Sequence, residues 1–226
     1  MKGFISEFLH IPSGVPQGSH FGPLLFTLYI NDIGNVDHLL YADDANIYKI
    51  ISTADHCCEL QADITSLSKY CYDNQLFLNP EKCSVITFTR IKAPIVYNYK
   101  LNDHHLDRVD KVRDLGVIID SKLTFNNHID ITVQMAYKQL GFIVRGCKPF
   151  QQEMTYMILY FSLVRSVLDF GCIIWSLFFK CHINRIERVQ KKFFSAIDYR
   201  MGHGRNSYKK SLSLQTVTLG RSSNSI

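Results

Sequence analysis

The stretch His38-Leu39-Leu40-Tyr41-Ala42-Asp43-Asp44-Ala45-Asn46-Ile47-Tyr48-Lys49-Ile50 is the best indicator of fold in the first half of this chain. Two runs of β-forming residues flank adjacent aspartates, which predicts a hairpin with buried strands over 38–42 and 45–50 and a bend at Asp43-Asp44. Two like charges repel each other there, and a divalent cation with oxygen ligands would remove that repulsion. Aspartate is also a common turn residue, so a metal site and an ordinary turn both stay open.

Helix signals lie on both sides of this hairpin. A turn-rich segment over residues 12–19 ends at Ser19, which can cap a helix, and Pro23 falls in the first turn, where its missing N–H does no harm. Thr53 can cap a second helix after the hairpin. The predicted apolar faces are Phe21, Leu24, Leu25 and Leu28 for the first helix, and Leu60, Ile64, Leu67 and Cys71 for the second.

The rest of the chain changes from strand-like to helical patterns near residue 120. Runs over 84–89, 95–101 and 115–119 are typical of strands, and apolar spacing predicts helices over 129–143, 154–168 and 183–197. The predicted fold class is therefore α+β. Its parts are a mixed region over residues 1–120, an all-α region over 121–198, and a disordered basic tail rich in Ser, Lys and Gly over 199–226.

The composition is that of a globular chain, because 46% of its 226 residues are apolar and 20% are charged. Such values exclude a fibre and a wholly disordered protein. Residues 1–80 carry three basic and nine acidic side chains, whereas residues 81–226 carry 22 basic and 11 acidic ones. This asymmetry indicates a metal or catalytic centre in the front part and an anionic partner bound by the later part. Chance asymmetry between two surfaces is the alternative.

Targeting and cysteine signals favour an intracellular protein, in the nucleus or the cytoplasm, over a secreted one. Glu7 falls where an export signal would need its apolar run. Arg165 and Asp169 lie in the middle of the apolar stretch over 154–179, which favours a buried helix over a membrane span. The seven cysteines include no C-x-x-C pair, which favours reduced thiols, no zinc module and no disulfide-linked partner.

Several short motifs follow one another from residue 13 onward. They are Ser13-Gly14-Val15-Pro16-Gln17-Gly18-Ser19, Gly22-Pro23-Leu24-Leu25-Phe26, Tyr29-Ile30-Asn31-Asp32-Ile33 and Tyr41-Ala42-Asp43-Asp44. In this order they resemble the central motifs of a reverse transcriptase from a non-LTR retrotransposon of the jockey-like or LINE-like kind. The resemblance extends over residues 3–198 through Asn79-Pro80-Glu81-Lys82-Cys83, Leu115-Gly116-Val117, Leu123-Thr124-Phe125 and Leu163-Val164-Arg165-Ser166.

The resemblance implies a partial polymerase palm, an antiparallel sheet with helices, followed by a helical thumb-like region. It implies an RNA-directed DNA polymerase that uses Mg²⁺ or Mn²⁺, an RNA template, a DNA primer and dNTPs. In the complete family, two metal ions support attack of the primer 3′-hydroxyl on the dNTP α-phosphorus. Asp43 would be a catalytic metal ligand and Asp44 its helper carboxylate. Lys82 would protonate the pyrophosphate leaving group, and a surface lysine is the alternative.

Other family positions fall on the turn before the first helix and at the end of the first strand. By resemblance, Pro16, Gln17 and Gly18 line the nucleotide and template pocket, where glycine lets the backbone approach a base or phosphate closely. Tyr41 is expected to pack under the active site, with a place in the plain core as the alternative.

The resemblance has a gap at its start. The family has a further palm aspartate upstream of the Pro16-Gln17-Gly18 turn, whereas residues 1–12 hold Glu7 as their one acidic residue. We therefore expect an N-terminally truncated domain without fingers that is inactive alone. A non-catalytic RNA- or DNA-binding remnant of a degenerate element is the alternative function.

A basic stripe on the last predicted helix fits contact with nucleic acid. Arg185, Arg188, Lys191 and Lys192 lie beside its apolar face, and such a stripe would bind a phosphate backbone without reading sequence. A solvated helix face with a cationic tail is the alternative.

Overall fold

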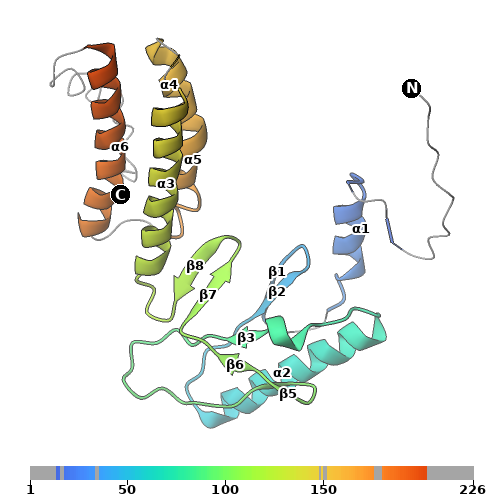
Figure 1. Cartoon of the computed structure of the whole chain (residues 1–226). Helices are drawn as coiled ribbons and strands as arrows, with labels where there is room; N and C mark the ends of the chain where they lie inside the picture. The colour runs from blue at the N-terminus through green and yellow to red at the C-terminus, as the bar shows by residue number, and fades with distance from the viewer. Residues whose placement is uncertain are drawn as a thin grey trace, which may run out of the picture. The chain divides into compact units, whose positions relative to one another are not determined.

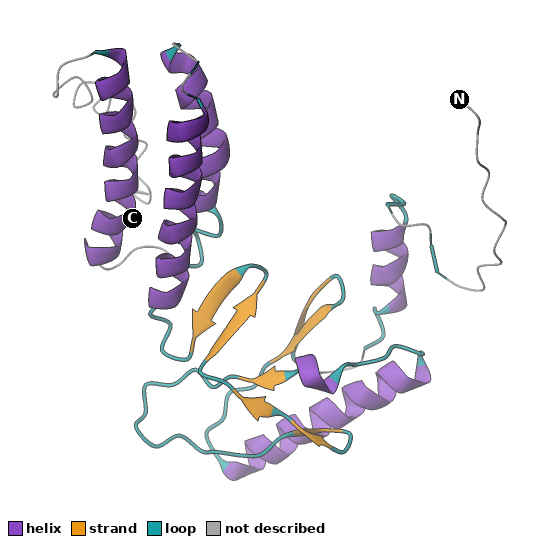
Figure 2. Cartoon of the chain, in the orientation of Figure 1, coloured by secondary structure: helices purple, strands orange, loops and turns teal. Residues whose placement is uncertain are grey.

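The structure is a computed structural model that describes residues 14–15, 18–33, 36–147, 149, 152–175 and 180–202. The chain forms two compact units, one of Met1–Val85 with Ile91–Val109 and one of Ile86–Arg90 with Asp110–Ile226. Helices and short strands occur together in the first unit, and long helices dominate the second (Figure 1, Figure 2). The predicted α+β class is confirmed. The predicted basic tail lies outside the described residues from residue 203 onward.

The first unit is built around one long helix. Helix α1 is Gly22–Tyr29, and the strands β1 (His38–Tyr41) and β2 (Asp44–Ile47) form a hairpin ahead of helix α2 (Ala54–Asp73). A 3-10 helix, Pro80–Lys82, follows α2. The remaining strands are β3 (Ser84–Val85), β4 (Lys100–Leu101), β5 (His104–His105) and β6 (Asp107–Arg108).

Helix α2 supplies the core of this unit, as its apolar spacing predicts. Ile64, Leu67 and Cys71 are buried on one face, because residues three and four apart lie on the same side of a helix. Strand β4 is tied to this helix by the Gln61 side-chain amide. Its Oε1 accepts the Lys100 N–H at 2.8 Å, and its Nε2 donates to the Lys100 carbonyl at 2.9 Å. Both apolar packing of Leu101 and the paired amide of Gln61 therefore hold β4 on α2.

The single antiparallel sheet predicted for residues 1–120 is not formed among the described residues. The strands pair two by two, β1 with β2, β3 with β6, β4 with β5 and β7 (Lys111–Asp114) with β8 (Val117–Asp120), and the β3–β6 pair is parallel. The run over 95–101 forms a strand only at Lys100–Leu101, while Ile95 and Val96 stay exposed. Strand formation depends on packing against neighbouring side chains. An apolar run that no other element packs against therefore does not continue as a strand.

Helix α1 forms where its signals predict, but its apolar face is exposed. Pro23 lies in the first turn as predicted, but the N-cap residue is Phe21 and not Ser19. The Ser19 hydroxyl accepts the Phe21 N–H at 3.3 Å, just before the helix. No residue of α1 is buried. The Tyr70 hydroxyl of α2 donates to the Tyr29 carbonyl at 3.0 Å. The helix is thus attached at its C-terminal end.

The second unit consists of one hairpin and three helical segments. Strands β7 and β8 meet at Leu115 and Gly116, which both have positive φ. Helix α3 (Asn126–Gly146) packs against helix α6 (Lys180–Met201) and against a bent segment between them. That segment is made of α4 (Glu153–Leu159), a π-helix (Tyr160–Arg165) and α5 (Ser166–Asp169). The division into units begins the second unit at Asp110, ten residues before the predicted boundary at residue 120, so the β7–β8 hairpin belongs to the second unit.

The π-helix keeps one apolar face of the middle segment in the core. Tyr156, Tyr160, Val164 and Leu168 are all buried, and each follows the previous one at an interval of four positions. An α-helix has 3.6 residues per turn, so side chains at intervals of four would move gradually around its axis and leave the core. The wider turns of the π-helix offset this rotation and keep these side chains on one face. Arg165 donates to Asp169 at 2.6 Å across the same segment. No helix in the described part of the chain is long and apolar enough to cross a membrane.

One carboxylate holds the loop between β8 and α3. Asp120 accepts the N–H groups of Lys122 at 3.1 Å, Thr124 at 3.0 Å and Phe125 at 2.7 Å, and the Thr124 hydroxyl at 3.1 Å. Partial burial raises the pKa of Asp120, but these hydrogen bonds outweigh burial and hold the pKa below its ordinary value. Leu123 and Phe125 have φ of 54° and 56°, so the carboxylate stabilises a loop conformation that non-glycine residues rarely adopt.

His128, in the first turn of α3, links this helix to β8. The Ile118 N–H donates to its Nδ1 at 3.3 Å, so the ring proton lies on Nε2, which is 3.5 Å from the Thr132 hydroxyl. Burial lowers the pKa of His128. The ring also lies 5.5 Å from that of Trp175. A neutral imidazole is therefore part of the packed core.

Candidate functional site

The predicted hairpin is present, with its turn one residue earlier than expected. Strands β1 and β2 are antiparallel, and Tyr41 pairs with Asp44. The turn consists of Ala42 and Asp43, and Ala42 has a φ of 51°; positive φ at this position is typical of tight hairpin turns. Asp44 is therefore the first residue of β2 and not a bend residue, so the two carboxylates belong to adjacent residues, one in the turn and one on the strand.

One face of the hairpin is exposed, contrary to the prediction that both strands are buried. Residues opposite each other in an antiparallel pair lie on the same face, so Tyr41 and Asp44 share a face with Leu39 and Asn46. Tyr41 is 65% exposed and Leu39 is 63% exposed. The alternative of a place in the plain core is wrong for Tyr41, because no described element covers this face. Tyr41 instead lies beside Asp44 at the surface.

The base of the hairpin is anchored to α2. Leu40 and Ile47 pack against the apolar cluster of this helix. Directly after β2, the Lys49 ammonium forms ion pairs with Glu59 at 2.9 Å and Asp63 at 3.2 Å. The hydrogen bond between Lys49 and Glu59 raises the pKa of Lys49 and lowers that of Glu59. One side of the hairpin is thus fixed, while the turn and the opposite face are accessible.

Two exposed carboxylates on adjacent residues offer oxygen ligands to a hard cation. Mg²⁺ is usually held by one or two protein carboxylates together with substrate phosphates and water, so Asp43 and Asp44 fit this ion as a donor set. Among the residues that the structure describes, no group of three or more His, Cys, Asp or Glu side chains could hold a metal. The hairpin could therefore offer two carboxylates to a cation, but the described residues hold no complete set of ligands.

The other residues predicted for this site lie on separate segments of the first unit. Gly18 is exposed and has a φ of 82°, a conformation that favours glycine. Pro16 and Gln17 lie outside the described residues. Lys82 is the exposed last residue of the 3-10 helix. No hydrogen bond or ion pair within the described ranges joins Lys82 or Gly18 to the carboxylates, so their roles stay predictions.

The four predicted cations of the basic stripe are all on α6, but three have partners within the second unit. The contacts are an ion pair of Arg185 with Asp130, an ion pair of Lys191 with Glu187 at 3.0 Å, and the Lys192 ammonium 5.3 Å from the centre of the Tyr137 ring. Arg188 is exposed and pairs with none of the residues that the structure describes. The charge available to an outside ligand is smaller than the sequence indicates.

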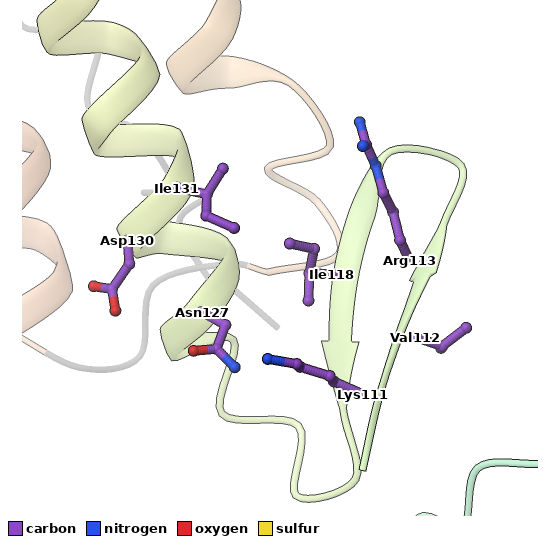
Figure 3. A pocket seen from close by; sticks show the side chains of 7 residues that line it. All are labelled: Lys111, Val112, Arg113, Ile118, Asn127, Asp130 and Ile131. Atoms are coloured by element: carbon purple, nitrogen blue, oxygen red, sulfur yellow. The ribbon is translucent and has the colours of Figure 1, made fainter. Parts of the chain in front are cut away.

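A groove between the β7–β8 hairpin and the start of α3 contains cations that the sequence patterns did not single out. It has a volume of about 340 Å³ and is lined by Lys111 and Arg113 of β7 and by Asn127 and Asp130 of α3, among others. Figure 3 shows the Lys111 side chain extending from β7 toward Asn127. Lys111 and Arg113 are two residues apart on a strand, so they lie on the same face. The spacing of these two cations, at alternate positions of a predicted strand, is the sequence feature that could have indicated a shared basic face.

The sequence of the chain matches one known family. An α+β unit with a hairpin that exposes adjacent carboxylates suits a protein that binds metal ions and phosphates. The family described as "Reverse transcriptase (RNA-dependent DNA polymerase)" matches residues 4–119, which include the hairpin and Lys82. The chain belongs to the reverse transcriptase family.

Relatives from Drosophila melanogaster have names that agree with this family. The chain is 29% identical over 206 residues to "Probable RNA-directed DNA polymerase from transposon BS", 27% over 218 residues to "RNA-directed DNA polymerase from mobile element jockey" and 28% over 201 residues to "Probable RNA-directed DNA polymerase from transposon X-element". These alignments cover 82%, 85% and 83% of this chain but 22% of each relative. No solved structure matches the chain. The predicted relation to reverse transcriptases of jockey-like retrotransposons is confirmed.

Proposed function

We propose that this chain is part of an RNA-directed DNA polymerase of a non-LTR retrotransposon, and that its β1–β2 hairpin carries two of the metal ligands. The observation that carries this proposal is the placement of Asp43 and Asp44 at an exposed hairpin turn within the segment that the family matches. The first unit would then be part of the palm, and the helices of the second unit would belong to the thumb.

The carboxylates are suited to Mg²⁺ or Mn²⁺ in this role. A bound divalent ion would stabilise the charge that develops on phosphate oxygens during nucleotidyl transfer. The role proposed for the chain is to hold the hairpin that carries Asp43 and Asp44 in a fixed position. The paired strands and the ion pairs of Lys49 with α2 support this role. Because the described residues contain no group of three such ligands, we expect weak metal binding and no polymerase activity by this chain alone.

The proposed substrates are an RNA template, a DNA primer and dNTPs. Lys82 is proposed to act on the triphosphate, and Pro16, Gln17, Gly18 and Tyr41 to contact nucleotide or template. In the second unit, Lys111 and Arg113 in the groove beside α3 present positive charge, and phosphate contacts by such cations give affinity without sequence preference.

The metal assignment is tested by titrating Mn²⁺ into the purified chain and following free Mn²⁺ by electron paramagnetic resonance. The double variant Asp43→Asn/Asp44→Asn is expected to lose the binding that the parent shows. Asp73→Asn is the matched control, because this carboxylate is exposed at the end of α2 and should leave binding unchanged. Equal Mn²⁺ binding by the parent and the double variant would refute the assignment.

Activity is tested with the same variants by primer extension on poly(A)/oligo(dT) with Mg²⁺ or Mn²⁺. We expect extension by the chain alone to stay at the level of the double variant. Extension above that level would contradict the expected inactivity, and its loss in the double variant would still support the role of the carboxylates. Extension that the double variant retains would refute their catalytic role.

A further inference from the structure

The outer face of α6 carries one aromatic side chain that the core does not use. Tyr199 is 88% exposed, the largest fraction for any aromatic residue described in the second unit. The core face of the same helix holds Ile186, Val189, Phe193 and Ile197, all buried. A phenol ring left almost wholly in water contributes little to folding, so this ring is accessible to a ligand.

Tyr199 lies in line with Arg188, an exposed cation of α6 that forms no ion pair among the described residues. It follows Arg188 by 11 residues, which places the two about 20° apart around the helix axis and about 16 Å apart along it. Asn184 and Ser195 fall on the same stripe and are also exposed. The stripe therefore combines a cation, two small hydrogen-bonding side chains and a flat ring on one solvent-facing line of α6, which packs its other side on α3 (Figure 1).

Charge decides which kind of partner suits this surface. Lys191 is on the edge of the stripe and forms an ion pair with Glu187, whereas Arg188 forms no ion pair among the described residues. A planar guanidinium binds phosphate oxygens well, and an exposed tyrosine offers a face on which a base can stack. The distance of about 16 Å corresponds to roughly five nucleotides of a stacked strand.

We propose that Arg188, Asn184, Ser195 and Tyr199 form a binding line for single-stranded nucleic acid, with Arg188 on a phosphate and Tyr199 stacked on an unpaired base. A single strand is required because the bases of a duplex already stack on each other and leave no face for the ring. The inference rests on the proposed function for the class of ligand, but it requires neither the metal nor the carboxylates of the hairpin.

The test is fluorescence anisotropy with labelled 12-nucleotide oligo(U) RNA, oligo(dT) DNA and a 12-base-pair duplex, without metal or dNTP. Tyr199→Leu is expected to weaken single-strand binding roughly tenfold and to leave duplex binding unchanged, because stacking is lost. Tyr199→Phe should bind like the parent. Arg188→Gln should weaken binding and lower the salt slope by about 0.7, the value for one phosphate contact in a single strand.

Matched controls come from α2. Tyr72 is 81% exposed and Lys69 is exposed on the same helix, so Tyr72→Leu and Lys69→Gln remove a similar ring and a similar charge elsewhere. Both should bind like the parent. The proposal is overturned if Tyr199→Leu binds like the parent, if it weakens duplex and single strand equally, or if the parent binds no single strand. Asp43→Asn/Asp44→Asn should keep this binding, which separates the inference from the polymerase assignment.

Discussion

Replacing Asp120 by alanine should destabilise the second unit through the loop that begins α3. The carboxylate accepts three backbone N–H groups and one hydroxyl at 2.7–3.1 Å. Water can replace it at the exposed Lys122 N–H, but Thr124 and Phe125 are half-buried. With hydrogen bonds to a charged group worth about 1.5–3 kcal/mol each and a discount for this partial exposure, we expect a loss of about 2–3 kcal/mol in the free energy of unfolding.

The assay is urea unfolding followed by tryptophan fluorescence. Trp175 is the one tryptophan of the chain and is buried in the second unit, so the signal reports on that unit. Asp120→Asn keeps one acceptor oxygen and should lose less than Asp120→Ala. Asp110→Ala is the control, because its exposed side chain should change stability by less than about 0.5 kcal/mol.

The pH dependence gives the same prediction a second readout. Since the folded pKa of Asp120 lies below its ordinary value, the unfolded state takes up the proton first as pH falls. The stabilisation is therefore complete above the unfolded pKa, near 3.8, and is lost as pH falls through the folded pKa. If Asp120→Ala unfolds within 0.5 kcal/mol of the parent, about the size of an ordinary surface change, packing of Phe125 and not the carboxylate holds the loop.

Three further predictions follow from buried or paired polar groups. Because burial lowers the pKa of His128, the unfolded state binds its proton more readily, so the second unit should lose stability as pH falls below 6.5; Trp175 fluorescence in urea at pH 7.5 and 5.0 checks this, and His128→Gln should reduce the difference. The buried Tyr160 hydroxyl has no hydrogen-bond partner among the described residues, so Tyr160→Phe should raise stability by about 1 kcal/mol, and a loss of similar size would show that the hydroxyl is bonded. Gln61→Ala removes both contacts to the backbone of Lys100, and should speed hydrogen exchange of that amide by about fivefold or more, as expected for a lost bond worth about 1 kcal/mol; unchanged exchange would contradict the tie.

The helices are the part of the fold that the sequence predicts best. The spacing of Ile64, Leu67 and Cys71 predicts the buried face of α2, and all three are buried. Helix periodicity is a local property, since residues three or four apart meet whatever surrounds the helix. The same pattern on α1 predicts the helix but not its exposed face, because burial depends on what lies opposite.

The hairpin turn shows where local pattern is insufficient. Aspartate favours turns, so Asp43-Asp44 is the natural bend, yet the register pairs Tyr41 with Asp44 and places Ala42 in the turn. Register is strongly specified only where one face is buried, and the outer face of this hairpin is exposed. Long-range ion pairs are equally hidden, since nothing local to Arg185 indicates that Asp130 of α3 will pair with it.

The charge asymmetry of the sequence coincides with the division of the structure into two units. The first unit carries seven basic and 12 acidic side chains, and the second carries 18 and eight. Acidic groups in the unit with Asp43 and Asp44 favour cations there, while they repel a polyanion. Positive charge in the other unit, at Lys111, Arg113 and Arg188, would attract the polyanion proposed as the ligand. If the two functions reside in separate units, high salt should weaken nucleic-acid binding steeply, whereas substitutions of Asp43 and Asp44 should leave that salt dependence unchanged.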